Sequence, residues 1–77
     1  MPERLLLRGG RALEFRVSPA DCPGDILREY AVAFMVAKHG AYPTDARAAW
    51  LRMQHLELPE TWEGLEQQCV MTLAGLL

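Results

Sequence analysis

The chain has 77 residues, of which 51% are hydrophobic, and its formal net charge at pH 7 is −2. This length predicts a single domain over residues 1–77. The slight negative charge argues against a general nucleic-acid binder, because such proteins are normally basic. The longest apolar run, residues 31–37, is far too short to span a membrane.

The apolar content is high for so small a protein. A chain of this size buries only about 60–65% of the surface that it exposes when unfolded. We therefore expect apolar side chains outside the core, and a contiguous patch of them usually marks an interface.

Two cysteines, Cys22 and Cys69, are too few for a disulfide framework and match no redox motif. A reducing cytoplasm is the simpler setting. The run Leu5-Leu6-Leu7 ends at Arg8 and is too short for the apolar part of a signal peptide. We therefore expect a cytoplasmic protein.

Residues 1–17 read as a β-hairpin that turns at Gly9-Gly10. The arm after the turn alternates apolar and polar residues, with Leu13 on its apolar face. A two-residue loop would pair Leu6 with Leu13, whereas a three-residue loop pairs Leu5 with Leu13. We prefer the longer loop because it gathers the apolar residues on one face.

Three helices follow, over residues 18–40, 44–57 and 59–77. The first opens at Ser18-Pro19 with a short turn before its main part begins near Pro23, and Gly40 stops it. Thr44 caps the second helix, and Pro59 precedes the third. Each has an apolar stripe at helical spacing, made of Ile26, Leu27, Tyr30, Ala33, Phe34 and Ala37, then Ala46, Ala49, Trp50 and Met53, then Trp62, Leu65, Cys69, Leu73 and Leu76.

These elements predict an α+β fold, in which the N-terminal β-hairpin packs on the long first helix and two further helices complete the domain. On the first helix, Val32, Met35 and Val36 lie to one side of the predicted stripe. A helix that is apolar over most of its circumference is buried on two sides. We expect another molecule to cover the second side.

No arrangement of residues points to catalysis, a cofactor or a metal. The four potential zinc ligands Cys22, His39, His55 and Cys69 are at least 14 positions apart, whereas structural zinc sites bring their ligands in close pairs. Cys22 has no orienting motif around it, and Gly9-Gly10 is explained by a hairpin turn. The sequence therefore predicts a protein that is not an enzyme.

Charge is unevenly distributed along the chain. Residues 1–16 contain four arginines against two glutamates, and residues 57–77 contain four glutamates and no basic residue. The hairpin arginines could grip an acidic protein surface through forked hydrogen bonds. Large apolar side chains could anchor a partner. The predicted partner-binding residues are Arg4, Arg8, Arg16, Val32, Met35, Val36, Trp50 and Trp62.

We therefore expect a non-catalytic protein–protein interaction module that binds another protein and itself forms a homodimer. The function we favour is that of a small inhibitor or accessory protein of the phage or mobile-element kind, which acts by occupying a surface of its partner protein. One alternative is a homodimeric assembly chaperone or adaptor. The other is a small nucleic-acid-binding regulator, which the acidic start of the third helix disfavours.

Overall fold

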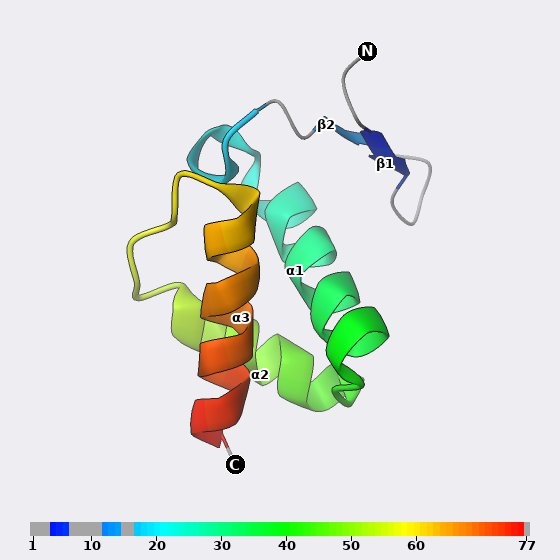
Figure 1. Cartoon of the computed structure of the whole chain (residues 1–77), viewed down its shortest axis with the longest axis vertical. Helices are drawn as coiled ribbons and strands as arrows, with labels where there is room; N and C mark the ends of the chain where they lie inside the picture. The colour runs from blue at the N-terminus through cyan, green and yellow to red at the C-terminus, as the bar shows by residue number, and fades with distance from the viewer. Residues whose placement is uncertain (1–3, 7–11, 15–16, 77) are drawn as a thin grey trace.

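The computed structural model describes residues 17–76 with their side chains, and the backbone of residues 4–6 and 12–14. In chain order, the elements are β1 (Arg4–Leu6), β2 (Ala12–Glu14), a 3-10 turn (Pro19–Asp21), α1 (Gly24–His39), α2 (Pro43–Met53) and α3 (Trp62–Leu76). Helices α1 and α3 run side by side in the same direction, and α2 crosses near their C-terminal ends (Figure 1).

The predicted α+β class is wrong, because the three helices alone make the folded body. β1 and β2 pair antiparallel with Leu5 opposite Leu13, which is the register that a three-residue loop predicts. Extensive contacts among the described elements join the three helices to one another and the two strands to each other. Two three-residue strands are too short to form a layer on α1, and such a pair is marginal alone. The loop of the predicted hairpin lies outside the described residues.

Helix α1 begins and ends close to the predicted positions. The 3-10 turn precedes it, and Pro23 stands directly before its first residue. At its C-terminal end, Gly40 has a φ of 63°, in the left-handed region that glycine enters without steric cost. The amides of Gly40 and Ala41 both donate to the carbonyl of Met35, that of Ala41 at 3.1 Å, so the chain closes back on the last turn of the helix.

Helices α2 and α3 are shorter than predicted. Helix α2 begins at Pro43 rather than after a Thr44 cap. Proline suits the first helical position because the amide hydrogen that it lacks would have no partner within the helix, and because its φ is already fixed near the helical value. It ends at Met53 instead of at residue 57. Helix α3 begins at Trp62, and Thr61 caps it by accepting a hydrogen bond from the amide of Gly64 at 3.0 Å.

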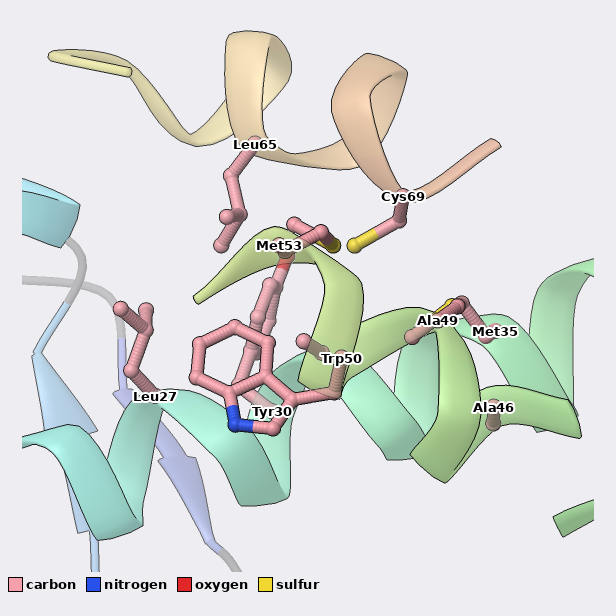
Figure 2. Packing of buried hydrophobic residues seen from close by; sticks show 10 residues of the cluster. Leu27, Tyr30, Met35, Ala46, Ala49, Trp50, Met53, Leu65 and Cys69 are labelled. Atoms are coloured by element: carbon pink, nitrogen blue, oxygen red, sulfur yellow. The ribbon is translucent and has the colours of Figure 1, made fainter. Parts of the chain in front are cut away.

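The core lies where the three helices meet. Leu65 and Cys69 project from α3 toward Met53 and Trp50 of α2 (Figure 2). Its buried residues are Leu27, Tyr30, Ala31, Met35, Ala46, Ala49, Trp50, Met53, Leu65 and Cys69. All four predicted stripe residues of α2 are buried, which confirms that stripe.

The predicted stripe of α1 is only partly correct. Ala33 and Ala37 are exposed, whereas Ala31 and Met35 are buried. The reason is that α1 contacts both other helices. Its apolar residues are therefore divided between two contact faces within this chain, and the helix needs no other molecule to bury Met35.

Candidate functional site

Several residues that the sequence suggested for partner binding lie in or against the core. Met35 has none of its surface exposed, and Trp50 has 6%. Val32 and Val36 are half-buried and pack against the core cluster. None of these four side chains forms an open surface of the folded chain.

Trp62 is half-buried and joins the start of α3 to α1 and to the segment before α1. Its indole Nε1 donates to the carbonyl of Val17 at 2.9 Å, and its ring meets the ring of Tyr30 edge-on, with centroids 4.9 Å apart. Both contacts fix the start of α3 beside the start of α1. We therefore assign Trp62 a structural role.

The predicted arginine surface lies largely beyond what the structure describes. Arg8 and Arg16 are outside the described residues. Arg4 belongs to β1, of which only the backbone is described. Their role in binding stays a prediction.

An open groove follows the surface between α1 and α3. It has a volume of about 450 Å³ and is lined by Phe34, His39, Glu66, Gln67, Val70 and Met71. Val70 has 37% of its surface exposed and Met71 has 75%. We call this feature the α1–α3 groove. Large apolar side chains therefore meet solvent along a hollow, which singles the groove out from scattered surface leucines.

Side-chain contacts fix the acidic end of this groove. The Tyr30 hydroxyl donates to Glu66 Oε1 at 2.7 Å, which holds the carboxylate against α1. Burial, followed by this hydrogen bond and the charge of Glu66, raises the pKa of the Tyr30 hydroxyl above its ordinary value of 10. The tyrosine therefore remains a hydrogen-bond donor at neutral pH.

The other end of the groove lies at the C-terminus of α1. The rings of Phe34 and His39 meet edge-on, with centroids 5.0 Å apart. Lys38 stands next to His39 in the last turn of α1 and is exposed. The groove therefore runs from a carboxylate at one end, past Phe34, Val70 and Met71, to basic residues at the other.

A second cavity, of about 470 Å³, lies between the start of α1 and the end of α2. Its lining includes core residues such as Trp50 and Met53, together with Asp25, Arg28 and the thiol of Cys22. Burial raises the pKa of that thiol, and the charge of Asp21 raises it further. A nucleophilic cysteine needs the opposite shift, so this geometry gives Cys22 no catalytic activation.

The potential metal ligands stay apart. Within residues 17–76, no three His, Cys, Asp or Glu side chains gather in a group that could hold a metal ion. Cys22 and Cys69 are both free thiols, and neither histidine lines the cavity that contains Cys22. In the part of the chain that the structure describes, no helix has the length and apolar character that crossing a membrane requires.

Comparison with protein-family models, with curated proteins and with solved structures finds no match to this chain. The site must therefore be interpreted from its own geometry.

The exposed residues of the groove are not among the partner-binding residues that the sequence predicts. Val70 and Met71 fall between the members of the predicted α3 stripe, which contacts the core through Leu65 and Cys69. Apolar residues that lie off the buried stripe of an amphipathic helix are the signal that would have identified them.

Proposed function

We propose that this chain is a non-catalytic protein-interaction module that binds its partner through the α1–α3 groove. The observation that carries the proposal is the exposure of Met71 and Val70 beside Phe34 along a hollow between two helices. A methionine side chain adapts its shape to a partner, which suits a binding surface.

The groove has the composition of a protein interface. Apolar side chains occupy its middle, and charged or polar groups stand at its ends. Protein interfaces have this arrangement of an apolar centre and a polar rim. The second cavity supports binding less well, because its apolar lining consists partly of core residues that are already buried.

The alternatives are less well supported. Nucleic acid would meet Glu63 and Glu66 along α3, and carboxylates repel phosphates. An enzyme would need a positioned acid, base or nucleophile, whereas the raised pKa of Cys22 keeps this thiol protonated. The narrower prediction of a cytoplasmic inhibitor or accessory protein remains compatible with a small binding surface.

Substitution within the groove tests the proposal. Met71→Glu places a charge at its apolar centre, and because Met71 is 75% exposed, the fold should tolerate the change. The tagged protein and the variant are each used to capture proteins from a lysate of the native host, and quantitative mass spectrometry compares the captured proteins. We expect the captured amount of one specific partner protein to be at least about tenfold lower with Met71→Glu than with the wild type.

Leu51→Glu is the matched control. Leu51 is 66% exposed, so the same charge enters an apolar surface position, but on α2 and outside the groove. The control should capture the partner at the wild-type level. Equal capture by wild type and Met71→Glu, with both proteins folded by circular dichroism, would overturn the groove as the binding surface.

A further inference from the structure

We infer that the partner in the α1–α3 groove is a second copy of this chain, bound antiparallel in a two-fold symmetric dimer. This inference rests on the proposed function and identifies the partner of the same surface. Charge is distributed unevenly along the groove, with acidic residues at one end and basic residues at the other.

The acidic end of the groove is formed by α3. Glu63 is in the first turn of α3, and Glu66 and Val70 follow it at spacings of three and seven residues, so these three residues share one side of the helix. Glu66 is held against α1 by the hydroxyl of Tyr30. The acidic residues thus precede Val70 and Met71 along the groove.

The basic end is formed by α1. Lys38 follows Phe34 by four residues, so both face the same side of α1, and His39 packs on the ring of Phe34. Helices α1 and α3 run in the same direction (Figure 1). Lys38 and His39 are in the last turn of α1 and Glu63 is in the first turn of α3, so the basic and acidic residues lie at opposite ends of the groove.

A surface with this polarity is complementary to itself when one copy is turned around. In a two-fold dimer, if one residue of the first copy contacts a second residue of the other copy, the symmetry repeats the same contact with the copies exchanged. Every pairing is therefore made twice. The antiparallel arrangement brings Glu63 and Glu66 of one copy toward Lys38 and His39 of the other, whereas a parallel arrangement would oppose like charges. Phe34, Val70 and Met71 of both copies then meet at the centre.

Small residues beside the apolar centre allow the helices of two copies to approach closely. Ala37 follows Phe34 by three residues, Ala74 follows Met71 by three, and both alanines are exposed. Neither side chain would hold the facing helix away. The apolar residues of the two copies can therefore reach one another.

Sedimentation equilibrium across the micromolar range tests this inference. We expect the wild type to be a dimer, and we expect Met71→Glu to raise the dimer dissociation constant at least about tenfold, because a symmetric interface contains the new charge twice. Leu51→Glu should leave the dissociation constant unchanged.

A charge exchange tests the antiparallel orientation. Lys38→Glu and Glu63→Lys should each weaken the dimer, because each variant opposes like charges across the interface. The double variant should regain most of the wild-type affinity. Two single effects that simply add in the double variant would overturn the antiparallel pairing.

A wild-type monomer throughout this range would overturn the dimer. If Met71→Glu still removed a partner captured from lysate, the proposed function would survive with a different protein in the groove. A dimer that Met71→Glu leaves intact would place the contact between copies elsewhere and would also overturn the inference.

Discussion

Cys69 lies at the centre of the core with 1% of its surface exposed, facing Met53 across the contact between α3 and α2 (Figure 2). Burial raises the pKa of its thiol from 9.0 to about 11, and the charge of Glu66 contributes in the same direction. At neutral pH, Cys69 is therefore an uncharged small core residue.

This pKa predicts a loss of stability at alkaline pH. The folded state has the higher pKa, so the contribution of Cys69 is complete below pH 9 and is lost as the pH rises toward 11. Near pH 10 the loss should be about 1 kcal/mol in the free energy of unfolding, measured by urea titration.

Cys69→Ala is the control for this effect. Tyr30 also has a raised pKa and adds its own alkaline dependence, so the informative quantity is the difference between wild type and variant. Cys69→Ala should be less stable near neutral pH because it leaves a small cavity, yet it should lose less stability on alkalinisation. Parallel pH profiles for the two proteins would contradict the assignment.

The residue scale also shows where sequence patterns stop being informative. The α2 stripe could be predicted, since Ala46, Ala49, Trp50 and Met53 face one core. Met35 could not be placed on the correct side, because α1 contacts two helices and its apolar residues follow two overlapping stripes. Only the positions of α2 and α3 decide which apolar residue of α1 is covered.

At the scale of the element, α3 depends on a glycine that helix propensity would disfavour. A Cβ at Gly64 would lie 2.9 Å from Cβ of Pro59 and 3.1 Å from Oγ1 of Thr61. The rigid ring of Pro59 has little freedom to move away. The segment before α3 therefore folds back closely over its first turn.

The two glycines of α3 should respond oppositely to alanine. In an open helix position, Gly→Ala stabilises by up to about 1 kcal/mol, and Gly75 has nothing near its missing Cβ. We expect Gly75→Ala to raise the thermal midpoint slightly and Gly64→Ala to lower it. A rise with Gly64→Ala would show that Pro59 moves aside at little cost.

Element boundaries were predictable where backbone chemistry is specific. Gly40 ends α1 because its left-handed φ suits glycine. The start of α2 was misplaced by one residue, since Pro43 and Thr44 are both acceptable near a helix start. The end of α2 at Met53 was not predictable in the same way, because no glycine or proline stands near the last residues of this helix.

At the scale of the whole molecule, the three helices supply every residue of the buried hydrophobic cluster among residues 17–76. The α+β prediction failed because alternation in a short segment indicates a strand without showing that the strand joins the core. The α1–α3 groove was not predictable either, because it depends on how two helices far apart in sequence are aligned.

Removal of residues 1–16 tests this account of the fold. Val17, which accepts the hydrogen bond from Trp62, is retained. We expect helical circular dichroism and one cooperative unfolding transition, with a free energy of unfolding within about 1 kcal/mol of the full chain. Loss of cooperative unfolding would show that the N-terminal segment is needed for the body to fold.

The hydrogen bonds that hold α3 beside α1 also affect the folding rate of the chain. Tyr30 reaches Glu66 across 36 positions, and Trp62 reaches Val17 across 45. Each of these contacts can form only when the long loop of chain between the two residues closes. Loop closure costs conformational entropy, and this cost is smaller for contacts between residues close in sequence. For a body built from three helices, we therefore expect slow folding kinetics, limited by the packing of α3 against α1 rather than by helix formation.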